Sequence, residues 1–192
     1  MIYPIVIYGD PILHKKAVNI DENYPELDKL IEGMYSTMYK ASGIGLAAPQ
    51  IGKSIRLFVV DASPIAEDDE ENTQLKDFKK VFINAEIIEE SEEEWKFEEG
   101  CLSIPGIREH VERPEKIRMR YQDEKFNSYI EEFDGIAARI IQHEYDHIEG
   151  ILFIEHLSAF KRSLLKGKLT AMSKGEVDAN YPVKRPAAKK KS

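Results

Sequence analysis

The sequence is poor in the features that mark disulfide-linked, secreted and membrane proteins. Its 192 residues include one cysteine, which excludes an internal disulfide and fits a reducing compartment. No apolar run approaches the roughly 20 residues of a membrane-spanning helix. The first residues lack the charged leader and apolar core of a secretory signal. These absences predict a cytoplasmic protein that does not bind a membrane.

The sequence also lacks an excess of basic residues, because its 35 acidic residues outnumber its 27 lysines and arginines. The formal net charge of −8 argues against non-specific binding of DNA, which requires a positive surface. With 42% hydrophobic residues, the chain can bury the core of one domain, which we place at residues 1–175. Residues 176–192 end in a lysine cluster and are expected to form a disordered basic tail. A monomer is the default expectation.

The order of the predicted elements favours an α+β fold. We expect antiparallel or mixed β-sheets packed around a central helix, with one helix near each terminus. The acidic residues 67–71 are expected in a solvated loop. The other predicted elements are a helix over 24–41, a glycine-bearing loop over 43–50, strands over 55–61, 81–88 and 95–97, a hairpin with arms at 116–123 and 128–133, and helices over 135–149 and 158–174.

The predicted central helix carries the pentapeptide His143-Glu144-Tyr145-Asp146-His147. A spacing of four residues is about one helical turn, so both imidazoles leave the same face and can hold one metal ion. Glu144 lies beside them and can move a proton. A single histidine on an apolar helix is more often a core residue, but this pair with an intervening glutamate favours a metal site.

A catalytic metal normally has three protein ligands and one open position. The only cysteine, Cys101, lies in the segment Glu99-Gly100-Cys101-Leu102-Ser103. A free cysteine is often a small core residue. Here Gly100 allows close approach of the backbone, Pro105 is expected to end the segment, and a thiolate would complete a Cys/His/His set.

Three stretches, in this order, resemble the peptide deformylase family. They are Gly43-Ile44-Gly45-Leu46-Ala47-Ala48-Pro49-Gln50, then Glu99-Gly100-Cys101-Leu102-Ser103, then Gln142-His143-Glu144-Tyr145-Asp146-His147. The resemblance extends over about residues 4–175. It implies removal of the formyl group from the N-terminal formyl-methionine of nascent polypeptides, with release of formate. The ribosome, where such chains emerge, is a candidate partner of the C-terminal helix and tail.

The resemblance also implies the roles of individual residues. Cys101, His143 and His147 would bind one divalent metal, Fe²⁺ natively, with Zn²⁺, Ni²⁺ or Co²⁺ able to substitute. Glu144 would act as the proton carrier, and the Gln50 amide and Leu102 N–H would stabilise the oxyanion. The substrate-binding residues would be Ile44, Gly45, Gly100, Arg108, Ile136, Arg139 and Ile140.

Arg139 departs from the aliphatic residue of better-known bacterial members of the family. It lies one turn before His143, so it shares the ligand face of the helix. Its stem could cover the methionine while its guanidinium reaches the rim and narrows or polarises the pocket mouth. The alternative is that Arg139 turns away and pairs with a surface acid. Asp146 is expected either to support the site from behind or to lie on the helix surface.

Other functions are compatible with parts of this pattern. A zinc endopeptidase also uses His-Glu-x-x-His, but its third ligand would lie downstream, and the Gly-Cys-Leu-Ser segment would have no role. A closed structural zinc site would need a fourth ligand, and His14 and His110 show no matching pattern. A relative that has lost activity is disfavoured because all the essential residues are present.

Overall fold

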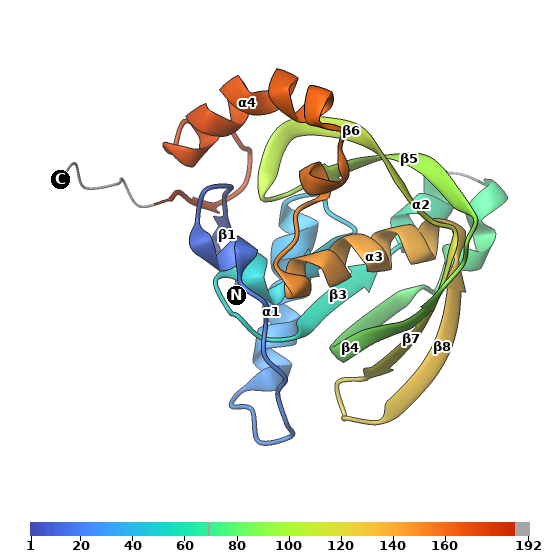
Figure 1. Cartoon of the computed structure of the whole chain (residues 1–192). Helices are drawn as coiled ribbons and strands as arrows, with labels where there is room; N and C mark the ends of the chain where they lie inside the picture. Colours follow the sequence, from blue (N-terminus) through green and yellow to red (C-terminus); the bar gives the residue numbers. More distant parts are fainter. Residues whose placement is uncertain (69, 187–192) are drawn as a thin grey trace.

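The computed structural model of the chain describes residues 1–68 and 70–186, including the side chains of all of these except 67, 68, 70 and 71 (Figure 1). The helices are α1 (Leu27–Lys40), α2 (Ser63–Asp68), α3 (Gly135–Glu149) and α4 (Ala159–Ser173), with 3-10 turns η1 (Pro11–His14), η2 (Ala48–Ile51), η3 (Glu70–Leu75) and η4 (Phe153–His156). The strands are β1 (Ile5–Val6), β2 (Gly45–Ala47), β3 (Leu57–Asp61), β4 (Lys79–Glu90), β5 (Glu94–Cys101), β6 (Ile104–Pro114), β7 (Lys116–Gln122), β8 (Ser128–Asp134) and β9 (Val183–Lys184).

The main sheet has five antiparallel strands in the order β2-β3-β4-β7-β8. Strand β3 is buried on both faces, which explains its unbroken apolar sequence. Phe58 and Val60 point into the core cluster that includes α3, whereas Leu57 and Val59 point into the cluster that includes α1. The sheet therefore separates the two helices, and α3 lies on one of its faces.

Helix α3 is the centre of the molecule. Ala137, Ala138 and Ile141 pack it on the sheet, and the β5–β6 hairpin covers its other side (Figure 1). A third core cluster joins the hairpin to the N-terminal segment and to α4, through residues such as Ile104, Val6 and Leu169. The predicted α+β class with a central helix is confirmed. In the described part of the chain, no helix combines the length and the apolar character needed to cross a bilayer.

Several predicted boundaries need correction. The first helix begins at Leu27 rather than at residue 24, because Glu26 takes a left-handed conformation with φ of 52°. The expected loop over 43–50 contains β2 and η2. Pro105 does not end its segment but lies in β6, a strand absent from the sequence prediction. The backbone of 67–68 and 70–71 is helical rather than a loop, while Asp69 and the exposure of the side chains at 67–71 lie outside the described residues.

The C-terminal part also differs from its prediction. On α4, Phe160 and Leu164 are exposed whereas Leu169 and Met172 are buried, so the predicted apolar stripe is only partly used. The expected disordered tail does not begin at residue 176. Residues 176–186 fold back, and β9 pairs in parallel with β1 through Ile5↔Val183 and Val6↔Lys184. Residues 187–192 lie outside the described range.

Candidate metal centre

The three residues predicted to bind a metal meet in the centre of the fold. His143 and His147 lie one turn apart on α3, and Cys101 is the last residue of β5. One ligand atom from each lies within 4.8 Å of the other two, and all three residues are buried. Cys101 Sγ is 3.3 Å from His147 Nε2. A thiolate with two imidazoles suits several divalent transition metals, so the donor set fits one such ion.

The thiol environment favours ionisation. Burial alone would raise the pKa of the Cys101 thiol, but the charges and hydrogen bonds of His147 and His143 lower it to about 5. Burial opposes a charge on His143, yet its hydrogen bonds to Cys101 and Glu99 raise the pKa of that imidazole. The surroundings of Cys101 thus favour the thiolate form that metal binding requires.

Glu99 holds His143 from behind. Its Oε2 lies 2.9 Å from His143 Nδ1, which fixes the ring and leaves Nε2 for a metal. The same buried carboxylate accepts two hydrogen bonds from Arg113, with Nε at 2.7 Å from Oε1 and Nη2 at 3.0 Å from Oε2. Burial would raise the pKa of Glu99, but His143 and Arg113 hold it well below its usual value. Sequence reasoning missed this role, because nothing in a run of glutamates marks the one that is buried.

Arg113 also links Glu99 to Asp146. Arg113 Nη1 donates to Asp146 Oδ2 at 2.7 Å, and His156 Nε2 lies 2.7 Å from the same oxygen. The expectation that Asp146 lies behind the site is therefore met through Arg113 rather than by contact with a metal-binding histidine. The result is a buried network of alternating charges that joins β5, β6, α3 and η4.

Arg139 belongs to this network rather than to the pocket mouth. Its side chain is 2% exposed. Nη1 donates to Glu99 Oε1 at 3.0 Å and to the Val111 carbonyl at 3.1 Å, and Nη2 donates to the Trp95 carbonyl at 2.6 Å. The guanidinium also lies over the Trp95 ring, 4.9 Å from its centre. The expectation that it reaches the rim is wrong, and so is the alternative of a surface acid.

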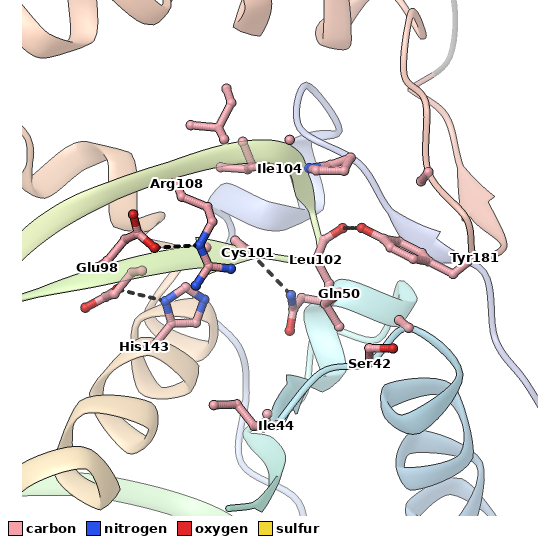
Figure 2. Close-up of a pocket in the computed structure, with 18 of the residues that line it drawn as sticks. Ser42, Ile44, Gln50, Glu98, Cys101, Leu102, Ile104, Arg108, His143 and Tyr181 are labelled. Carbon is pink, nitrogen blue, oxygen red and sulfur yellow. Dashed lines mark hydrogen bonds and ion pairs between the residues drawn. The ribbon is translucent and has the colours of Figure 1, made fainter. Parts of the chain in front are cut away.

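The cysteine side of the site is held by neutral hydrogen bonds. Gln50 is buried, and its Oε1 accepts from the Ala47 N–H at 2.8 Å. Its Nε2 donates to Cys101 Sγ at 3.6 Å (Figure 2). It also donates to Ser103 Oγ at 3.3 Å. The amide oxygen is thus anchored to the last residue of β2, and the NH₂ group is directed into the site.

Glu144 lies beside the ligands and is buried. Its Oε2 has no hydrogen-bond partner within the described residues, so one oxygen of the carboxylate is free to take a proton. Burial raises the pKa of Glu144 to about 7, against the opposing charges of His143 and His147. A side chain on Gly45 would collide with this carboxylate, which explains the glycine at that position of β2.

A cavity of about 970 Å³ opens onto these groups. Of the residues predicted to bind substrate, it is lined by Ile44, Gly45, Gly100, Arg108, Arg139 and Ile140, whereas Ile136 is outside the lining and packs against the core. Arg108 forms an ion pair with Glu98 at its mouth, with Nε 2.9 Å from Oε2 (Figure 2). Residues 178–181 also line the cavity, although the sequence had predicted a disordered tail at these positions.

A buried Cys/His/His set with a free carboxylate in an open cavity defines the class of metal-dependent hydrolases. Comparisons with known proteins identify the member of this class. The polypeptide deformylase family model matches residues 2–163. A peptide deformylase from Christiangramia forsetii is 53% identical over 99% of both chains, and one from Cytophaga hutchinsonii is 53% identical over 98% of this chain and all of that one.

Solved structures agree. The Thermus thermophilus peptide deformylase superposes with a TM-score of 0.80 at 40% identity, covering 91% of this chain and 99% of that one. Arabidopsis thaliana peptide deformylase 1B in complex with an inhibitor gives a TM-score of 0.78 at 32% identity, covering 96% and 98%. The chain belongs to the polypeptide deformylase family, metal-dependent enzymes that remove the N-formyl group from nascent peptides. The zinc endopeptidase alternative finds no support.

Proposed function

We propose that this chain removes the formyl group from N-formylmethionyl peptides with Fe²⁺ held by Cys101, His143 and His147 and with Glu144 as the proton carrier. One observation supports this most directly: the three buried ligand atoms lie within 4.8 Å of one another, beside a carboxylate with a free oxygen. Zn²⁺, Ni²⁺ or Co²⁺ would occupy the same ligands. When bound, the metal supplies Lewis-acid chemistry that activates water and polarises the formyl oxygen.

Glu144 would move the proton in this reaction. Its pKa of about 7 lies near the working pH, which suits a group that must first accept a proton and then release it. It would take the proton from the attacking water at Oε2 and pass it to the leaving amine. Burial keeps bulk water from competing for that oxygen.

Gln50 and Leu102 would stabilise the negative charge that develops on the formyl oxygen. The Gln50 amide is fixed by its bond from Ala47, and its Nε2 already faces the site. The Leu102 N–H follows directly after the thiolate ligand in the tight turn between β5 and β6. Donors fixed in advance are effective because they need not reorganise during the reaction.

The cavity would take the methionine side chain and the peptide after it. Ile44 and Ile140 provide apolar wall. Gly45 lies on the edge strand β2 and Gly100 on β5 of a two-stranded sheet, so each strand is paired on one side only and its other edge would pair with an extended peptide. Arg108 would contact the peptide near the mouth. We further propose a cytoplasmic monomer that meets its substrates at the ribosome. Residues 1–175 would form the body of its catalytic domain, and residues 178–181 of the following segment would complete the wall of the cavity.

The test is formate release from a formyl-Met tripeptide by protein that is prepared without oxygen and loaded with Fe²⁺ or Ni²⁺. We expect Cys101→Ala to lose metal and activity. Glu144→Ala should keep the metal and lose at least about 10²-fold in rate. Glu132→Ala, an exposed acid on β8, is the matched control and should behave as wild type. Wild-type rates from Glu144→Ala, or casein cleavage without formate release, would refute the proposal.

A further inference from the structure

The turn between the two strands of the hairpin carries a ligand and a proposed oxyanion donor on consecutive residues. Cys101 pairs with Ile104, so Leu102 and Ser103 form the tip. The Leu102 carbonyl lies in the peptide plane that follows Leu102, whereas the Leu102 N–H lies in the plane before it, and the two planes meet at the Leu102 Cα. In so tight a turn, with Cys101 and Ile104 paired on either side, a contact that fixes the following plane therefore also restricts the direction of the Leu102 N–H.

Both carbonyls at the tip are held from behind by the two chain segments that form the β1–β9 ribbon. The Ser103 carbonyl accepts from the Tyr8 N–H at 2.9 Å, two residues after β1. The Leu102 carbonyl accepts from the Tyr181 hydroxyl at 2.8 Å, two residues before β9 (Figure 2). The second bond joins residues 79 apart in the sequence and comes from the segment that the sequence analysis assigned to a disordered tail.

Tyr181 is itself rigidly placed. The following residue, Pro182, accepts a hydrogen bond from the Ile5 N–H at 2.9 Å, and Lys184 accepts one from the Ile7 N–H at 3.1 Å. The tyrosine ring packs against the core cluster that contains α1. Arg185 Nε donates to the Gly175 carbonyl at 3.0 Å, which ties the end of the segment to its beginning. The hydroxyl is thus presented to Leu102 by a fixed scaffold rather than by a mobile side chain.

The same segment borders the cavity. Residues 178–181 line it together with Leu102, and in Figure 2 Tyr181 reaches Leu102 from the side away from His143 and Arg108. We propose that Tyr181 is a positioning residue for deformylation: its hydroxyl fixes the peptide after Leu102, so that the Leu102 N–H meets the developing oxyanion. This inference rests on the proposed function, in which Leu102 is a donor.

The test compares Tyr181→Phe with Tyr35→Phe. Tyr35 is the matched control because its hydroxyl also donates to a backbone carbonyl, that of Lys80 at 3.0 Å, and its ring packs against the same core cluster. Each variant loses one hydroxyl and keeps the ring. Both are assayed as Ni²⁺-loaded full-length protein on formyl-Met amide and on a formyl-Met tripeptide, and backbone hydrogen exchange is measured over residues 101–104.

We expect Tyr181→Phe to lower kcat by about tenfold on both substrates, less than the loss of a whole oxyanion donor, with KM changed by less than about twofold. Exchange over residues 101–104 should be at least about threefold faster than in wild type. Tyr35→Phe should change neither. A rise in KM confined to the tripeptide would overturn the proposal, because it would make Tyr181 a peptide contact only.

Unchanged kcat together with unchanged exchange would also overturn it. If wild-type protein releases no formate, the proposed function fails, but the exchange measurement still decides whether Tyr181 holds the turn. Faster exchange in Tyr181→Phe with normal kcat would show that the bond exists but does not position a catalytic donor, which again contradicts the proposal.

Discussion

The two halves of the metal centre are supported in opposite ways. The histidine half rests on a buried network of ions, in which Glu99 accepts from Arg113 and Arg139 while holding His143. Apart from the two imidazoles of the site itself, the cysteine half rests on neutral groups: the Gln50 amide, the Ser103 hydroxyl and the backbone of the hairpin turn. An imidazole needs an acceptor behind its second nitrogen, which a carboxylate supplies. A thiolate is already an anion, so neutral donors stabilise it without adding negative charge.

The difference has an energetic consequence. Removing one partner from a buried ion network leaves an uncompensated charge and is strongly destabilising. Removing one neutral hydrogen bond costs about 0.5–1.5 kcal/mol. Mutations on the histidine side should therefore act first on folding and metal retention, whereas mutations on the cysteine side should act mainly on rate.

Among the variants that test this comparison, Arg113→Met is expected to have the largest effect on stability. It leaves Glu99 and Asp146 without their shared cation, and we expect a loss of about 3–5 kcal/mol in the free energy of unfolding, measured in urea. Arg118→Met removes an arginine from the exposed pair with Glu89 and should cost at most about 1 kcal/mol. Equal losses in the two variants would show that the buried network is not what stabilises this side.

Arg139→Ile tests whether Arg139 stabilises the buried ion network or contributes to substrate binding in the pocket. It leaves the carbonyls of Trp95 and Val111 without this donor, so we expect a loss of about 1–3 kcal/mol in urea. KM for a formyl-Met tripeptide should change by less than about twofold. Arg139→Lys should recover only part of the stability, because an ammonium cannot span Glu99 and both carbonyls. A large rise in KM with an unchanged free energy of unfolding would contradict this assignment and would show that Arg139 acts at the mouth of the substrate pocket.

Glu99→Gln keeps the shape but removes the charge behind His143. We expect release of bound metal to a chelator to be about tenfold faster, the low end for residues that orient metal ligands. The neighbouring variant Glu98→Gln is the control, since Glu98 pairs with Arg108 at the surface and should leave the release rate unchanged. Equal release rates in Glu99→Gln and wild type would contradict the role given to this carboxylate.

Ser103→Ala probes the neutral half and should have the smallest effect. It removes an acceptor of the Gln50 amide, whose long 3.3 Å bond is worth little. We expect kcat to fall by about two- to threefold, with the free energy of unfolding within about 1 kcal/mol of wild type. A stability loss as large as that of Arg113→Met would erase the contrast between the two halves.

Sequence reasoning found the parts of this site that depend on local spacing. The two histidines share a helix face because their separation matches a helical turn, and Cys101 was the only thiol available. The supports of the site were missed because they depend on tertiary pairing. Glu99 resembles its neighbour Glu98 in the sequence, yet strand alternation turns one inward and the other to the surface. A buried acid inside a charged strand has no local signature.

The prediction for the C-terminal segment was wrong for a related reason. Residues 176–186 show no periodicity and are rich in polar side chains, so composition predicted disorder. Their order comes from a partner strand at the opposite end of the sequence, Ile5–Val6. The apolar face of α4 was misjudged because Phe160 and Leu164 lie on the turns that face away from the body of the protein. Such pairings become visible only once the chain is folded.

The bond from Tyr181 to Leu102 also determines when the active site can be completed during synthesis of the chain. Tyr181 follows Leu102 by 79 positions in the sequence. At a synthesis rate of about 5–20 residues per second, the ribosome therefore adds Tyr181 about 4–16 s after Leu102. A growing copy of this protein therefore carries its cysteine and both histidines before it carries the hydroxyl that holds the turn. The active site is finished late in the synthesis of each molecule, and its last structural component comes from a stretch far downstream of the metal ligands.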